Sequence, residues 1–113
     1  MENAEEFENA RQLLSHRLRW RACTELLAKP LLLSELARRL GVTPQRLQHH
    51  LNVLERVGVL RSDALYTEGT QRRRAVIHRY ALDKKRFVEF LDVLIRELEG
   101  VRNEAAAEAG EPD

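Results

Sequence analysis

Two short apolar patterns separated by a glycine, in residues 34–60, constrain the fold more than any other part of the chain. The first, SELARRL, repeats apolar residues at helical spacing, which predicts a short helix over residues 34–40. Gly41 follows it and suits the left-handed backbone of a helix C-cap. Thr43 and Pro44 suit the N-cap and the first position of a second helix. The stretch therefore predicts two helices joined by a tight turn.

The second of these helices is expected to have two different faces. Leu47, Leu51 and Leu54 recur at helical spacing and should be buried. The opposite face is polar, and Gln or Arg side chains there could contact adenine or guanine through two hydrogen bonds in the major groove of DNA. The alternative is that these residues are only exposed polar side chains. We interpret the pair of helices as a helix-turn-helix, and the predicted base-reading residues are Gln45, Arg46, Gln48 and His49.

Contacts with the DNA backbone are expected around the same helices. Thr43 lies where the free amides at the start of a helix favour phosphate. Asn52 lies one turn beyond the readers and should reach phosphate, and Arg38 and Arg39 on the first helix are further candidates. His50 follows the apolar face more closely and is predicted to be a half-buried packing residue.

The net charge of +1 conceals a strong segregation along the chain. Residues 1–10 carry four acids and no base, and residues 87–113 carry two Arg against eight acids. Residues 11–86 carry 17 Lys and Arg against 6 Asp and Glu. The alternative is that Arg-rich helices are simply well solvated, but beside a helix-turn-helix this basic centre favours a polyanion as the partner. We expect double-stranded DNA.

A β-hairpin is predicted after Gly58, up to Leu82. Two β-favouring runs flank residues 68–71, which have the composition of a turn. Arg at the tip could enter the minor groove or contact phosphate, although the alternative is a solvated turn. The basic residues expected at this tip are Arg72, Arg73 and Arg74. Leu31–Leu33, before the helix-turn-helix, is expected to be a short extended link.

Helices are also predicted at both ends of the chain. Residues 3–28 read as helical with a possible break near Ser15, and Lys29–Pro30 should end this region. Asp83 suits the N-cap of a last helix that we expect to run from Lys84 to about Val101. Residues 102–113 are small and acidic, which predicts a poorly ordered tail after a single domain over residues 1–101.

Both terminal helices carry apolar stripes that need a partner. The alternative is that they simply pack on their own domain, but a two-fold homodimer would cover both stripes at once. Such a dimer would present its recognition helices to half-sites about one turn apart, which predicts a pseudo-palindromic operator. The predicted interface residues are Phe7, Leu14, Phe87, Phe90, Leu91, Leu94, Ile95 and Leu98.

These elements predict a mainly α-helical chain with a small β-hairpin wing, in the order α-α-α-α-β-β-α. From Leu14 to about Leu98 the chain resembles the ArsR-type winged-helix regulators of bacteria and archaea. The resemblance rests on LSELARRLGVTPQRLQHHLNVLERVGVL and on Ser15, Arg19, Trp20 and Arg21. It implies a dimeric winged helix-turn-helix that regulates transcription, most simply as a repressor. The alternative is a winged helix used for protein interaction within a transcription or chromatin assembly.

The resemblance also invites a metal sensor, which we do not predict. The family's thiolate sites need two or more Cys, and this chain has Cys23 alone. The family's other site uses Asp and His from the last helix, where this chain has Asp92 but no His. A single Cys on a packed face is expected to be inert rather than redox-active. We therefore expect no metal and no other cofactor, and the effector is unknown.

Two further classes of protein are not indicated by the sequence. The sequence pairs no nucleophile with a nearby base and contains no Gly-rich phosphate loop, so it does not indicate an enzyme. No apolar run is long enough to cross a bilayer, and the acidic start differs from a signal peptide. We therefore expect a cytoplasmic protein.

Overall fold

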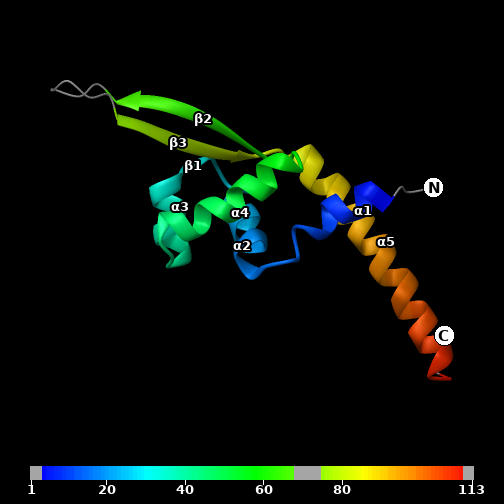
Figure 1. Ribbon diagram of the computed structural model, residues 1–113. Helices are drawn as coiled ribbons and strands as arrows, with labels where there is room; N and C mark the ends of the chain where they lie inside the picture. The colour runs from blue at the N-terminus through cyan, green and yellow to red at the C-terminus, as the bar shows by residue number, and fades with distance from the viewer. Residues whose placement is uncertain (1–3, 68–74, 111–113) are drawn as a thin grey trace.

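The computed structural model describes residues 4–67 and 75–110, which form five helices and a three-stranded sheet (Figure 1). In chain order the elements are α1 (Ala4–Arg11), α2 (Arg17–Glu25), β1 (Leu31–Leu32), α3 (Leu33–Leu40), α4 (Pro44–Arg56), β2 (Leu60–Thr67), β3 (Ala75–Leu82) and α5 (Lys84–Glu108). This order confirms the predicted winged helix-turn-helix, with the short strand β1 added before α3.

The helix-turn-helix consists of α3 and α4, and local signals set both of its inner ends. Gly41 caps α3 with a φ of +69°, in the left-handed region that favours glycine. Thr43 caps α4, because its hydroxyl accepts a hydrogen bond from the Arg46 amide at 3.2 Å. The side chains that join the two helices to the core are all buried, as predicted: Leu36, Ala37, Leu40, Leu47, Leu51 and Leu54.

The wing is the antiparallel hairpin of β2 and β3, and β1 adds a third strand on the other side of β3. Leu60 pairs with Leu82 at the base of the hairpin, and Leu31 pairs with Tyr80. Tyr80 and Leu82 are buried there, whereas Val76 further out is 50% exposed. The helices therefore cover only the base of the hairpin, and the rest projects away from them (Figure 1).

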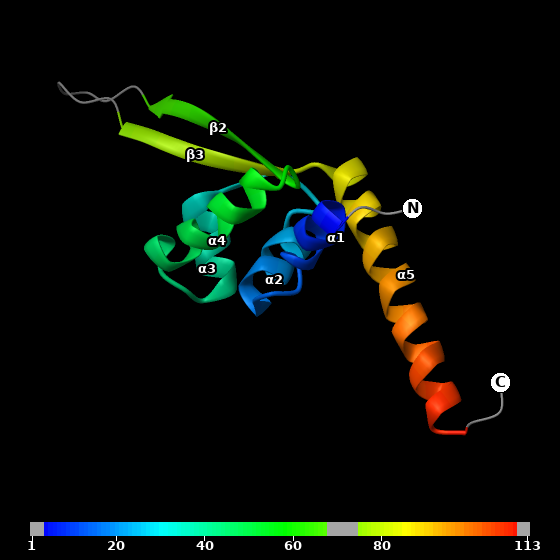
Figure 2. The same cartoon turned by 45° about the vertical axis from the view of Figure 1, so that its right-hand side comes forward.

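Helix α5 begins at Asp83, whose carboxylate accepts a hydrogen bond from the Arg86 amide at 3.0 Å. Its first half lies against α1, and the ring centroids of Trp20 on α2 and Phe87 on α5 are 5.9 Å apart. The second half extends away from the rest of the chain, on the side opposite the wing (Figure 2). The helix continues to Glu108, beyond the end expected near Val101, because the sequence there is rich in Ala, a strong helix former.

The helical region at the start of the chain is shorter and more broken than predicted. Helix α1 ends at Arg11 and α2 begins at Arg17, so the break expected near Ser15 is present. Helix α2 then ends at Glu25, before Lys29–Pro30. Leu27 lies at helical spacing from Cys23, which predicts an inward position, but it lies beyond the end of α2 and is 43% exposed.

Candidate nucleic-acid interface

The outward face of α4 presents polar side chains next to one another. Gln45, Arg46 and His49 are exposed on its first turns, and Gln48 beside them is half-buried. The opposite face of the same helix is fully buried in the core. The fold therefore brings the four predicted base-reading residues to one side of one rigid helix.

Gln48 forms a hydrogen bond with a residue of the wing. The position of Gln48 in the sequence did not indicate this contact. Its Nε2 donates a hydrogen bond to the Tyr80 hydroxyl at 2.7 Å and another to the Asn52 Oδ1 at 2.9 Å. Burial raises the pKa of Tyr80, so this hydroxyl stays protonated at neutral pH. Strand alternation puts Tyr80 on the same face as Leu82 and says nothing of its hydroxyl. A buried Tyr hydroxyl needs a hydrogen-bond partner, and this requirement could have suggested a contact with a polar residue of α4.

His50 anchors the other side of α4 and does not face outward. Its side chain is 8% exposed, and its Nδ1 accepts a hydrogen bond from Arg19 Nε at 3.0 Å. The His16 ring lies 4.2 Å away, and its Nδ1 caps the start of α2 by accepting from the Leu18 amide. His50 therefore holds α4 against α2, in agreement with the packing role predicted for it.

Exposed basic side chains lie on α3, which packs against α4. Arg38 is exposed and forms no ion pair with the part of the chain that the structure describes. Arg39 is also exposed, and its Nη1 lies 3.4 Å from the Glu25 Oε2. Thr43 and Asn52 are exposed as well. The three residues predicted for the wing tip, Arg72, Arg73 and Arg74, lie outside the described residues.

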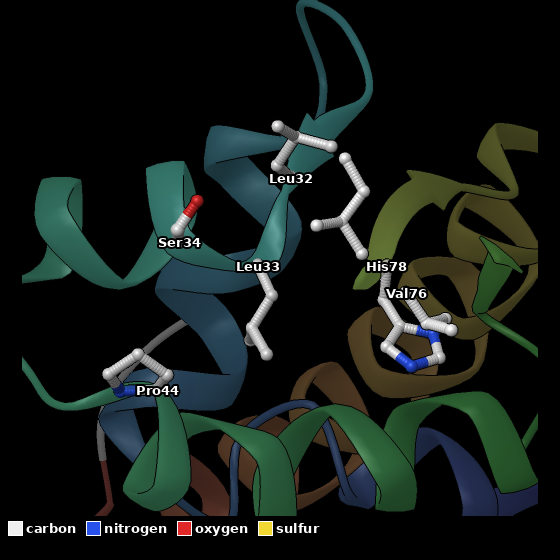
Figure 3. Close-up of a pocket in the computed structure, with 7 residues that line it drawn as sticks. Leu32, Leu33, Ser34, Pro44, Val76 and His78 are labelled. Carbon is white, nitrogen blue, oxygen red and sulfur yellow. The ribbon is translucent and has the colours of Figure 1, made fainter. Parts of the chain in front are cut away.

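A groove of about 170 Å³ lies beside the start of α4, between the β1–α3 junction and strand β3. Figure 3 shows Leu33 and Ser34 on one side of it, Val76 and His78 on the other, and Pro44 at the start of α4. Its lining is mostly apolar, so the groove does not suit a phosphate. The groove lies between β3 and the first turn of α4.

The residues predicted for the dimer interface fall into two groups. Phe87, Phe90 and Leu94 are buried within the chain, because α1 packs on this part of α5 and the Trp20 ring of α2 lies against Phe87. Phe7 and Leu91 are partly buried against the same core. The exposed members are Leu14, Ile95 and Leu98, at 50%, 49% and 60%. Val88 and Val101 on α5 are similarly exposed, so an apolar stripe of Val88, Ile95, Leu98 and Val101, with the partly buried Leu91 beside it, remains largely uncovered along this helix.

The single thiol lies away from this surface. Cys23 is fully buried, and burial raises its pKa to about 12. Within residues 4–67 and 75–110, no group of three His, Cys, Asp or Glu side chains is placed to hold a metal ion. None of the helices in these ranges is both long and apolar enough to cross a membrane.

Comparison with known proteins supports a DNA-binding regulator of transcription. A family model described as a helix-turn-helix domain matches residues 14–63. A search of curated protein sequences gives no match.

Several solved structures have a similar fold. An ArsR-like transcriptional regulator from Rhodococcus sp. RHA1 is 28% identical with a TM-score of 0.62, over 93% of this chain and 89% of that chain. A homodimeric winged helix-turn-helix DNA-binding domain from Mycobacterium bovis is 14% identical with a TM-score of 0.60, over 88% and 84%. The transcriptional repressor BigR from Xylella fastidiosa is 21% identical with a TM-score of 0.54, over 80% and 84%.

Proposed function

We propose that this chain, an ArsR-type winged helix-turn-helix protein, regulates transcription by binding a pseudo-palindromic DNA operator as a homodimer. We further propose that it acts there as a repressor in the cytoplasm. The observation that carries the proposal is the outward face of α4, where Gln45, Arg46 and His49 are exposed beside Gln48. Amide, guanidinium and imidazole groups on one rigid helix suit the base edges of the major groove.

The charge pattern supports DNA as the partner. The chain from residue 11 to residue 86, which contains the helix-turn-helix and the wing, carries 17 Lys and Arg against 6 Asp and Glu. Phosphate contacts supply much of the affinity of such proteins. We assign these contacts to Thr43, Asn52, Arg38 and Arg39, and to the predicted wing arginines.

The uncovered stripe on α5 supports a homodimer. Ile95 and Leu98 are apolar and about half exposed, although α5 is otherwise well packed at its start. A two-fold axis beside α5 would bury the same residues of both copies. It would also place two copies of α4 to face adjacent turns of DNA. The homodimeric winged helix-turn-helix domain from Mycobacterium bovis and the repressor BigR support these two parts of the proposal by analogy of fold.

The proposal is tested by selecting bound sequences from a random DNA library and measuring their affinity by mobility shift. We expect a two-fold-related consensus, and an affinity that falls roughly 10³-fold or more between about 50 and 200 mM salt if six or more phosphates are contacted. Absence of binding at low salt would contradict the proposal and would favour a protein-interaction module.

The same measurement separates phosphate contacts from base contacts. Arg38→Ala should weaken binding to all DNA sequences alike and reduce the salt slope by about 1. Lys85→Ala, on the side of α5 away from Leu98 and outside the helix-turn-helix, also removes one positive charge and serves as the control. Equal effects of the two substitutions would contradict a specific phosphate contact by Arg38.

A further inference from the structure

We propose that a second groove, at the base of the wing, is a binding site for a small organic anion with at least two negative charges. A phosphate ester and a polycarboxylate both have this chemistry. The groove measures about 410 Å³, within the range of about 300–1,000 Å³ that is usual for small-molecule sites. This inference goes beyond the proposed function, because it concerns a surface that the reading helix does not use.

The lining of this groove combines cationic and apolar side chains. Lys29, Arg61 and Lys84 are exposed there, and Leu26 and Leu82 are buried. None of the eight residues that line the groove is acidic. Three positive charges beside an apolar surface suit an anion that also has a hydrocarbon part.

Three separate elements bring the positive charges together. Arg61 lies on β2 and Lys29 lies two residues before β1, and these two strands flank β3 on its two sides. Lys84 is the first residue of α5, just after β3. The Asp83 amide donates a hydrogen bond to the Val59 carbonyl at 2.8 Å, which joins the start of α5 to the start of β2. Backbone hydrogen bonds therefore fix the frame of the groove before any ligand binds.

The groove lies on the face of the sheet that is turned away from α4. Ser62 and Tyr80 are paired across β2 and β3, and both form hydrogen bonds with side chains of α4. Successive side chains of a strand point to opposite faces, so the next pair, Arg61 and Ala81, points away from α4. We therefore expect DNA bound along α4 to leave this groove free, which favours a small anion over the phosphate backbone.

The positive charges have no counterion within the described part of the chain. The side chains of Lys29, Arg61 and Lys84 form neither an ion pair nor a hydrogen bond with any other residue in residues 4–67 and 75–110. Asp63, which strand alternation puts on the same face as Arg61, lies 3.4 Å from Arg79 instead. An anion with two or more charges would reduce the repulsion among the three cations and accept charge-assisted hydrogen bonds from them.

The test is a titration of the full-length protein, without DNA, followed through the backbone amide signals in NMR spectra. The probes are inorganic phosphate, phenyl phosphate, pyrophosphate and citrate. We expect saturable shifts at Lys29, Arg61, Ala81 and Lys84. Phenyl phosphate should bind more tightly than inorganic phosphate, because its ring covers the apolar part of the groove. The stronger of pyrophosphate and citrate identifies the ligand as a phosphate ester or a polycarboxylate.

Two neighbouring lysines provide a matched pair of variants. Lys84→Gln and Lys85→Gln each remove one exposed charge from the first turn of α5, and only Lys84 lines the groove. Lys84→Gln should weaken probe binding by roughly tenfold or more, as for the loss of one charged hydrogen bond. Lys85→Gln should change it by less than about twofold at about 0.15 M salt. Arg61→Gln, on β2, should match Lys84→Gln and does not depend on α5.

The outcomes separate this inference from the proposed function. The absence of saturable shifts from every probe up to about 10 mM would overturn the anion site, and so would equal effects of Lys84→Gln and Lys85→Gln. The shifts at Arg61 and Ala81 should persist in the complex with the operator. Their loss there would show that DNA covers the groove and would also overturn the inference. In each of these cases operator binding would stand, whereas a protein that selects no DNA but binds the probes would overturn only the proposed function.

Discussion

His50 is a side chain that the fold keeps in its neutral form. The hydrogen bond from Arg19 Nε, at 3.0 Å, requires an unprotonated Nδ1 on His50. Burial, together with the nearby charges of His16, Arg19, His49 and Arg46, lowers the pKa of His50 from 6.5 to about 4. At neutral pH the His50 imidazole therefore accepts a hydrogen bond that connects α4 to α2.

Acid should weaken the hydrogen bond between Arg19 and His50 and so lower the stability of the protein. The pKa of His50 is about 4 in the folded chain and 6.5 ordinarily, so the unfolded chain takes up the proton first. The contribution of His50 to stability is complete above pH 6.5 and is lost as the pH falls toward 4. We expect the urea midpoint to fall between about pH 7 and pH 5, and His50→Gln to flatten this fall.

The control for that experiment removes a different imidazole. His78 is exposed on β3, so His78→Gln should retain the wild-type pH dependence. A full wild-type dependence in His50→Gln would contradict the assignment to His50.

At the scale of single elements, two glycines have opposite roles. Gly41 ends α3 with a φ of +69°, whereas Gly100 lies inside α5. A Cβ built at either position meets nothing within 4 Å, so packing does not distinguish them. Gly41→Ala should destabilise the protein by roughly 1 kcal/mol, because an L-residue is strained in the left-handed region. Gly100→Ala should stabilise it by roughly 0.5–1 kcal/mol. Denaturant unfolding measures both, and changes of the same sign would contradict this account.

Elements that depend on local signals could be predicted from the sequence. The turn at Gly41, the cap at Thr43 and the cap at Asp83 each depend on residues within about one helical turn, and each is present as predicted. The end of α2 was misplaced, and Leu27 with it, because nothing near Glu25 interrupts the helical pattern. The chain leaves the helix there to reach β1, whose place beside β3 depends on residues far away in the sequence.

The sequence could predict which residues belong to the candidate site, but not which hydrogen bonds hold them in place. Helical spacing identified the outward residues of α4. The bonds of Gln48 to Tyr80 and of His50 to Arg19 join residues 32 and 31 positions apart. Such pairs depend on how the sheet and α2 approach α4, and no periodicity within one element contains that information.

At the scale of the whole molecule, α5 divides its apolar surface between two uses. Phe90 and Leu94 complete the core of the protomer, with exposures of 0% and 5%. Ile95 and Leu98, on the following turns, are 49% and 60% exposed. The protomer can therefore fold around the first half of α5, while the second half is available to a second copy.

This division predicts a variant that loses the dimer and keeps the fold. Leu98→Asp places a charge in the proposed interface twice, once from each copy. Each lost Leu contact is worth about 1.5–3 kcal/mol, so the dimer dissociation constant should rise at least about a hundredfold. Gly100→Asp adds the same charge to the opposite side of α5, in open space, and should leave the dimer intact. Light scattering on a size-exclusion column measures both, and an unchanged mass for Leu98→Asp would contradict the interface.

The burial of Cys23 leaves the whole outer surface open to selective labelling. Cys23 is the single cysteine of the chain, and its pKa of about 12 leaves almost no thiolate at neutral pH. A second cysteine placed on the surface, such as Asn103→Cys on the side of α5 away from Leu98, would therefore be the thiol that a maleimide probe modifies in the folded protein. Each copy of a dimer would carry one probe. The distance between two spin labels could then report how the α5 helices are arranged in solution, with and without DNA.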